Sequence, residues 1–152
     1  MTTLQNNFKT VFLTDDDSDD CMFFSDALNE LNSDAILTIT NDGVELMDAL
    51  DTTVPPPPYV IFLDLNMPRK NGFECLKEIR KSTKLMNIPV VVLSTNSNID
   101  IVNQSYDFGA NYYICKPKSF QLLKKSIALV LSFDVSKLNS KPSKDNFVLI
   151  LN

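Results

Sequence analysis

Short apolar runs alternate along this chain with longer segments whose apolar residues recur at helical spacing. The runs at 59–63 (YVIFL) and 89–93 (PVVVL) are continuous, which is typical of strands buried on both faces of a parallel sheet. Such runs predict strands at residues 9–14, 35–40, 59–63, 89–93 and 111–115. Helical spacing predicts helices at residues 18–31, 44–50, 72–81, 98–108 and 118–133. This alternation of five strands with five helices predicts an α/β fold, namely a flavodoxin-like, doubly wound parallel sheet in the order 2-1-3-4-5.

Three segments depart from the alternation. Residues 55–58 are four prolines, which predict a stiff surface connection because proline cannot supply the hydrogen bonds of a helix or inner strand. Residues 134–146 are polar and predict a linker. The apolar stretch Phe147–Leu151 predicts docking on the chain's own domain or, alternatively, strand addition to a partner's sheet edge. We expect one domain at 1–133 and a tail at 134–152 that is too short for a DNA-binding output domain.

Composition narrows the class of protein. The 152 residues carry a formal net charge of −5, which argues against nucleic-acid binding because that requires a basic face, and against adhesion to an anionic membrane. There is no histidine, which removes histidine metal ligands and phosphohistidine carriers. Residues 1–9 hold no apolar signal core, and no apolar run approaches a membrane span. The three cysteines lack CxxC spacing and are expected to be buried and reduced, as in a cytoplasmic protein.

Polar side chains follow four of the expected strands where those strands end. Asp15 and Asp16 follow the first strand, Asp64 the third, Ser94 the fourth and Lys116 the fifth. The carboxyl ends of parallel strands meet at one edge of a doubly wound sheet, where ligands bind, so we expect these side chains to converge. Carboxylates that lie this close repel one another, so at least one should have a raised pKa. Hard oxygen ligands without histidine or thiolate select Mg²⁺, or Mn²⁺, over Zn²⁺.

This set of side chains predicts a phosphoryl-transfer site. A divalent cation and the Lys116 ammonium would neutralise phosphate oxygens, and the Ser94 hydroxyl could bind another of them. Asp64 follows the middle strand and is therefore the best-placed carboxylate nucleophile.

Four motifs occur in order along the chain, and together they are specific. They are VFLTDDD at 11–17, VIFLDLNMPRKNGFE at 60–74, IPVVVLSTN at 88–96 and GANYYICKP at 109–117. These motifs resemble the receiver domains of bacterial two-component response regulators, and the resemblance covers residues 9–133. Among receiver domains, this chain most resembles the stand-alone, single-domain type.

The resemblance implies the roles of the residues around the acceptor. Asp64 would be the phosphoacceptor. Asp16, Asp64 and the backbone carbonyl of Asn66 would bind Mg²⁺, and Asp15 would act mainly through a metal-bound water. Lys116 would pair with the acceptor or with its phosphate.

The resemblance also implies a switch. Ser94, which stands where threonine is usual, would be the switch hydroxyl, and Tyr113 the switch aromatic. A cis Lys116–Pro117 peptide bond would aim the lysine inward. Other positions would adjust phosphate access or phosphate lifetime: Thr95, Asn66 and Asn96.

Partners follow from the same resemblance. The phosphoryl donor would be a phosphohistidine of a sensor histidine kinase or phosphotransfer protein. A downstream protein would contact the face formed by residues 98–133, and a homodimer is open. The chain would not be an enzyme beyond its own phosphorylation and dephosphorylation.

Other interpretations of the same residues remain. Asp15, Asp16 and Asp17 could be a solvated turn and helix cap, and Ser94, Asn96 or Ser97 could cap the next helix. A Mg²⁺-dependent phosphohydrolase would usually carry a second acid two residues after its nucleophile, where this chain has Asn66. The chain could also be an interaction module that kept the receiver fold and signals without phosphorylation, and failure to bind Mg²⁺ would support this alternative.

Overall fold

The central element of the structure, a computed structural model that describes residues 9–151, is a parallel five-stranded sheet. Its strand order is β2-β1-β3-β4-β5, so the predicted fold class is confirmed. Residues 1–8 and 152, which include most of the N-terminal stretch assessed for a signal core, lie outside the described residues. The strands are β1 (Thr10–Thr14), β2 (Ile36–Thr40), β3 (Val60–Leu63), β4 (Val90–Ser94) and β5 (Tyr112–Cys115).

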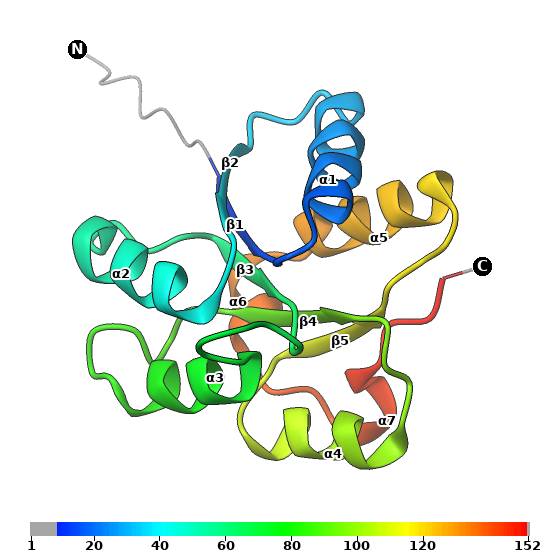
Figure 1. Cartoon of the computed structure of the whole chain (residues 1–152). Helices are drawn as coiled ribbons and strands as arrows, with labels where there is room; N and C mark the ends of the chain where they lie inside the picture. Colours follow the sequence, from blue (N-terminus) through cyan, green and yellow to red (C-terminus); the bar gives the residue numbers. More distant parts are fainter. Residues whose placement is uncertain (1–8, 152) are drawn as a thin grey trace.

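Helices cover both faces of the sheet, as a doubly wound fold requires. Figure 1 shows α1 and α5 together on one face and α2, α3 and α4 on the other. The bounds are α1 (Ser18–Glu30), α2 (Gly43–Thr53), α3 (Gly72–Lys81), α4 (Ile99–Asp107) and α5 (Phe120–Ser132). No helix within the described residues is long and apolar enough to cross a membrane.

The core consists of two apolar clusters, one on each face of the sheet. Every residue of β3 and β4 is buried, because these strands are covered on both faces and their continuous apolar runs supply side chains to both. Phe62 packs edge-to-face on Phe24 of α1, with ring centroids 5.0 Å apart. This contact anchors β3, one of the strands nearest the site, on α1.

Backbone hydrogen bonds fix the ends of the strands beside one another. Asp64 donates from its backbone N–H to Thr14 at 3.0 Å, and Lys116 donates to Ser94 at 2.8 Å. Because the strands are parallel, the residues that follow them emerge at the same edge. This pairing carries polar residues distant in sequence to one place.

Local signals set the helix ends near that edge. Asp17 is the N-cap of α1, where its side chain accepts hydrogen bonds from the backbone N–H groups of Asp19 and Asp20. The cap of α4 is Asn98, so Ser94, Asn96 and Ser97, which were considered for that role, do not fill it.

Gly72 allows the β3–α3 loop to fold back tightly on the end of β3. A Cβ atom at this position would lie 2.4 Å from the carbonyl oxygen of Asp64. Any larger residue would push the loop away from the carboxyl end of the strand.

The C-terminal segment is folded, which corrects the expectation of a polar linker. It contains two short helices, α6 (Val135–Asn139) and α7 (Lys144–Phe147), in addition to the five that were predicted. Leu138 and Phe147 are buried in the two core clusters, and these isolated apolar residues are enough to dock a segment that is polar on average. Val148 then pairs in parallel with Tyr113 of β5. Of the two arrangements considered for the apolar stretch, docking on its own domain is the one observed.

The cysteines only partly match expectation. All three are free, and Cys21 and Cys75 are buried, but Cys115 is exposed. Cys115 is the last residue of the β5 strand, at the rim of the sheet.

Phe147→Ala is expected to destabilise the protein by about 3 kcal/mol, because it removes a buried aromatic ring and leaves a cavity. The ring is 2% exposed and packs on two tyrosines. Urea unfolding measures the change. Ile150→Ala is the matched control: Ile150 is 81% exposed, so its loss should change the free energy of unfolding by less than about 0.5 kcal/mol. Equal values for the two variants would show that α7 is not anchored by Phe147.

Candidate functional site

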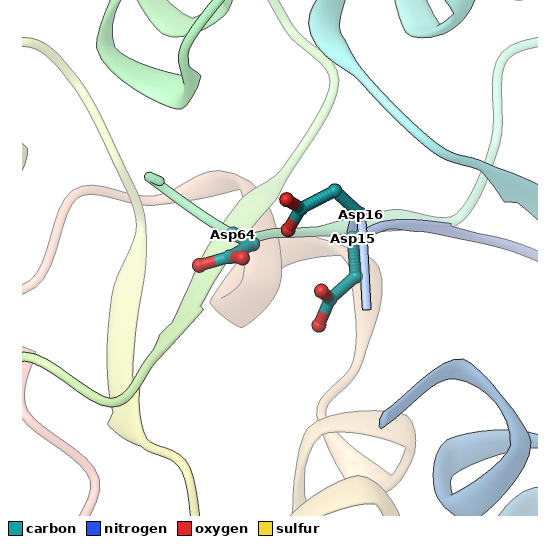
Figure 2. Close-up of side chains that lie close together, drawn as sticks. All are labelled: Asp15, Asp16 and Asp64. Atoms are coloured by element: carbon teal, nitrogen blue, oxygen red, sulfur yellow. The ribbon is translucent and has the colours of Figure 1, made fainter. Parts of the chain in front are cut away.

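Three carboxylates meet where β1 and β3 end. One oxygen from each of Asp15, Asp16 and Asp64 lies within 4.8 Å of the others. Figure 2 shows the side chains gathered at the ends of the two strands, with the carboxylate of Asp16 turned toward Asp64. Asp15 and Asp64 are buried, whereas Asp16 is exposed. The predicted convergence is therefore observed for all three acids.

The donor set of this cluster fits a hard divalent cation. Three carboxylate oxygens at this spacing can share one ion, and nothing else in the cluster would favour a soft metal. The sequence adds Asn66, which lies two residues beyond Asp64 in the exposed loop after β3. A cation here would also relieve the repulsion among acids that are partly removed from water.

The ammonium of Lys116 lies beside the acids, but it does not bind them equally. Its Nζ donates to Asp15 at 2.7 Å and to Asp20 at 2.9 Å, whereas its distance to Asp64 is 3.8 Å. Burial acts to lower the pKa of Lys116, but the hydrogen bonds to Asp15 and Asp20 outweigh it and raise the pKa above its ordinary value. The lysine is therefore charged at any physiological pH.

Asp20 was not among the site residues predicted from the sequence. It lies in the first turn of α1, and the helix brings it back over the acids that end β1. The sequence signal was present, because the expected helix begins directly after Asp15 and Asp16 and its first turn must lie close to them.

Asp64 is the acid whose protonation the fold alters most clearly. Burial raises the pKa of its carboxyl from 3.8 to about 6, Lys116 lowers it and the charge of Asp15 raises it again. This shift confirms that at least one of the crowded carboxyls has a raised pKa. At neutral pH the group is still largely ionised, so it is available as a nucleophile or a ligand.

The contribution of Asp64 to the stability of the metal-free protein is expected to fall as the pH rises through about 6. A carboxyl with a higher pKa in the folded state than in the unfolded state stabilises the fold fully below pH 3.8, and this contribution is lost as the pH rises through about 6. Asp64→Asn removes that titration. Without metal, we expect the variant to exceed the wild type in stability at neutral pH by roughly 1–3 kcal/mol.

Thermal unfolding in EDTA, followed from about pH 4 to about pH 8, tests this expectation. The difference between the two proteins should grow with pH. A difference that is constant or that shrinks as the pH rises would contradict a raised pKa at Asp64.

The residues after β4 form a small polar network with β5. Ser94 is buried, and its hydroxyl accepts a hydrogen bond from the backbone N–H of Asn96 at 3.2 Å. The hydroxyl of the buried Tyr113 donates to the backbone carbonyl of Asn96 at 2.5 Å. Thr95, which lies between Ser94 and Asn96 in the sequence, is exposed. The β4–α4 loop thus connects Ser94 physically to Tyr113.

The expected cis bond before Pro117 is wrong. In the described part of the chain the cis peptide bonds are Val54–Pro55 and Pro55–Pro56, so Lys116–Pro117 is trans. The trans form is intrinsically preferred before proline, and in this form Lys116 already reaches Asp15 at 2.7 Å. Directing the lysine inward therefore does not need the cis isomer.

The face expected to contact a downstream partner is partly covered by the chain's own C-terminal segment. The ring of Phe147 packs edge-to-face on Tyr106 of α4, with centroids 5.1 Å apart, and lies 6.2 Å from the ring of Tyr113. The Tyr106 hydroxyl donates a hydrogen bond to the backbone carbonyl of Pro142 at 2.8 Å. Figure 1 shows α7 beside α4. Any partner at this part of the 98–133 face would also meet the C-terminal segment.

Comparisons with known proteins agree on one family. A family model described as the response regulator receiver domain matches residues 11–128. The response regulator Rcp1 of Synechocystis sp. is 35% identical over 137 residues, which cover 88% of this chain and 93% of that protein.

Solved structures show the same likeness. The crystal structure of the phosphorylated cyanobacterial phytochrome response regulator RcpA has a TM-score of 0.75 at 36% identity, covering 82% of this chain and 95% of that one. The Mn²⁺-bound form of Rcp1 has a TM-score of 0.73 at 34% identity, covering 89% of this chain and 99% of that one.

Proposed function

This chain belongs to the response regulator receiver domain family, and we propose that it accepts a phosphoryl group on Asp64 in a Mg²⁺-dependent reaction. The observation that carries the proposal is the cluster of Asp15, Asp16 and Asp64 with the Lys116 ammonium beside it. Such domains act in two-component systems, where phosphorylation leads to signalling through a conformational change. The residue roles, the metal and the partners below are parts of the proposal.

The donor is a phosphohistidine on a sensor histidine kinase or a phosphotransfer protein. A carboxylate oxygen of Asp64 attacks the phosphorus, and a new O–P bond forms as the P–N bond to the histidine breaks. The electron pair of that bond stays on the imidazole nitrogen. Asp64 is only 6% exposed, so little water can compete with its carboxylate for the phosphorus. The chain holds the acyl phosphate as a signal until water hydrolyses it, which regenerates the Asp64 carboxylate and releases inorganic phosphate.

Mg²⁺, or Mn²⁺, would be held by Asp16, Asp64 and the backbone carbonyl of Asn66, with Asp15 acting through a water. When bound, the ion supplies charge neutralisation for the transferring phosphoryl group. Lys116 would supply a second positive charge to the phosphoryl group, and its Nζ lies 3.8 Å from Asp64.

The response passes from Ser94 to Tyr113. Ser94 meets the phosphate with its hydroxyl, which now accepts a hydrogen bond from Asn96. The Tyr113 hydroxyl is hydrogen-bonded to the backbone carbonyl of Asn96. A movement of Ser94 therefore shifts Asn96 and weakens the hydrogen bond that holds Tyr113. Thr95 lies at the phosphate entrance, and Asn66 and Asn96 adjust the phosphate lifetime.

The surface that a downstream protein contacts is the 98–133 face together with the C-terminal segment that packs on it. Residues 1–133 form the receiver domain and 134–152 its C-terminal segment, which does not act as an output domain. The protein works in the cytoplasm, where phosphohistidine donors are made from ATP. The 98–133 face can also join two copies of the chain as a homodimer.

Intact-mass analysis after incubation with acetyl phosphate tests the proposal. We expect a gain of one phosphoryl group with Mg²⁺ and none with EDTA. Some receivers do not accept small donors, so a negative result is followed by a phosphorylated donor protein and by beryllofluoride. If the folded protein fails with all three, it is an interaction module that signals without phosphorylation. Continuous release of phosphate from generic phosphate esters would instead indicate a phosphohydrolase.

A further inference from the structure

The ammonium of Lys116 is held on the α1 side of the site. It lies 2.7 Å from Asp15 and 2.9 Å from Asp20, but 3.8 Å from Asp64. Lys116 follows the last residue of β5, whereas Asp20 lies in the first turn of α1. The lysine is thus hydrogen-bonded to Asp20 of α1 and lies farther from Asp64, the carboxylate that would become phosphorylated.

We propose that Asp20 is a positioning residue that restrains Lys116 away from Asp64 and so slows phosphoryl acceptance. This inference rests on the proposed function, in which Lys116 must reach a phosphoryl oxygen on Asp64. The ammonium would have to shift toward Asp64 from its present distance of 3.8 Å, and its 2.9 Å hydrogen bond to Asp20 resists that shift.

Asp15 cannot play this part, because it differs from Asp20 in burial and surroundings. The side chain of Asp15 is 2% exposed and belongs to the carboxylate cluster that fits a cation. A cation there would compensate the charge of Asp15 in place of the lysine. Asp20 is 42% exposed and is not one of the clustered acids, so it keeps its hold on Lys116 whether or not the cluster is filled.

The restraint is weak enough to be released. Asp20 can be hydrated when the lysine leaves, because its carboxylate is partly in water. An ion pair of this exposure changes an equilibrium by up to about fivefold. Asp20 is therefore suited to adjust the rate of phosphoryl acceptance and not to prevent it.

Asp19 offers a matched control. It stands next to Asp20 in the first turn of α1 and carries the same charge, so it has a similar effect on the helix dipole and on the general field at the site. Among the described residues, no ion pair between Asp19 and Lys116 is formed, while Asp20 forms one at 2.9 Å. A comparison of the two amide variants separates the contact from the loss of one negative charge.

The experiment follows phosphorylation by acetyl phosphate at saturating Mg²⁺, with intact mass as the readout, for wild type, Asp20→Asn, Asp19→Asn and Asp20→Glu. We expect Asp20→Asn to be phosphorylated about fivefold faster than wild type. Asp19→Asn should stay within about twofold, because it changes only the screened surface charge. Asp20→Glu, which keeps a carboxylate, should return toward the wild-type rate.

A second readout needs neither metal nor phosphate. The side-chain ammonium resonance of Lys116, observed with ¹⁵N-lysine labelling in EDTA, should shift in Asp20→Asn and not in Asp19→Asn. Equal rates for the two amide variants, or slower phosphorylation of Asp20→Asn, would overturn the inference. If the wild type accepts no phosphoryl group, the proposed function fails, and an unshifted Lys116 resonance in Asp20→Asn would separately overturn the restraint.

Discussion

Replacing Asp64 by asparagine is expected to abolish phosphoryl acceptance. The carboxylate has two nucleophilic oxygens, and its raised pKa of about 6 leaves it ionised at neutral pH, whereas an amide is a poor nucleophile and provides one weaker ligand. We do not expect a neighbouring acid to replace it. The carboxylate of Asp15 is hydrogen-bonded to Lys116 at 2.7 Å, and Asp16 follows β1, not β3, and is exposed.

Intact mass measures this result under the conditions that phosphorylate the wild type. We expect no phosphoryl adduct on Asp64→Asn, with either acetyl phosphate or a phosphorylated donor. Unfolding cannot explain the loss, because the same variant is expected to be more stable than the wild type in EDTA. A full adduct on the folded variant would mean that another residue accepts the phosphoryl group.

Asp16→Asn is expected to weaken Mg²⁺ or Mn²⁺ binding by at least about tenfold to a hundredfold. Removal of a group that only supports a metal ligand costs that much, and Asp16 is one of the two clustered carboxylates that would contact the ion directly. The change also removes a negative charge from a site where the cation must overcome dehydration. Phosphorylation at limiting Mg²⁺ should fall in proportion, and excess Mg²⁺ should restore part of it.

Calorimetric titration with Mn²⁺ or Mg²⁺ measures the change in affinity directly. Asp17→Asn is the matched control, since it removes one charge from the neighbouring residue. Asp17 caps α1 through its side-chain oxygen, and asparagine caps a helix about as well as aspartate. We expect its affinity to stay within about threefold of the wild type, in line with a screened, indirect charge effect. Indistinguishable titrations for the two variants would remove Asp16 from the metal site.

Tyr113 lies between the phosphorylation site and the C-terminal segment, and this position bears on signalling. Tyr113 contacts Asn96 on the side of the phosphorylation site and Phe147 on the side of the C-terminal segment. A residue with both contacts can transmit a change at Ser94 to the surface that a partner would meet. The effect of Phe147→Ala on stability therefore also reports how firmly that surface is held.

The pattern of apolar residues was sufficient to predict the sheet and its order. Continuous apolar runs at β3 and β4 can only be buried between two helical layers, and the strand ends then fix where Asp15, Asp64 and Lys116 emerge. The acids of the site were predictable for the same reason, because each follows a strand directly. A helix cap at Asp17 was among the possibilities that the local sequence allowed, and the structure has it there.

Other features depended on distant contacts. The docking of residues 135–149 rests on a few buried side chains, such as Leu138 and Phe147, and composition averaged over a polar segment does not register them.

The sequence by itself determined which strands carry the acids and which chemistry those acids can perform, because both depend on short-range pattern and residue type. Only the tertiary structure decided how the Lys116 ammonium is divided among Asp15, Asp20 and Asp64. That division depends on distances between side chains from different elements and on the burial of each carboxylate. Neither quantity exists until the helices have packed on the sheet.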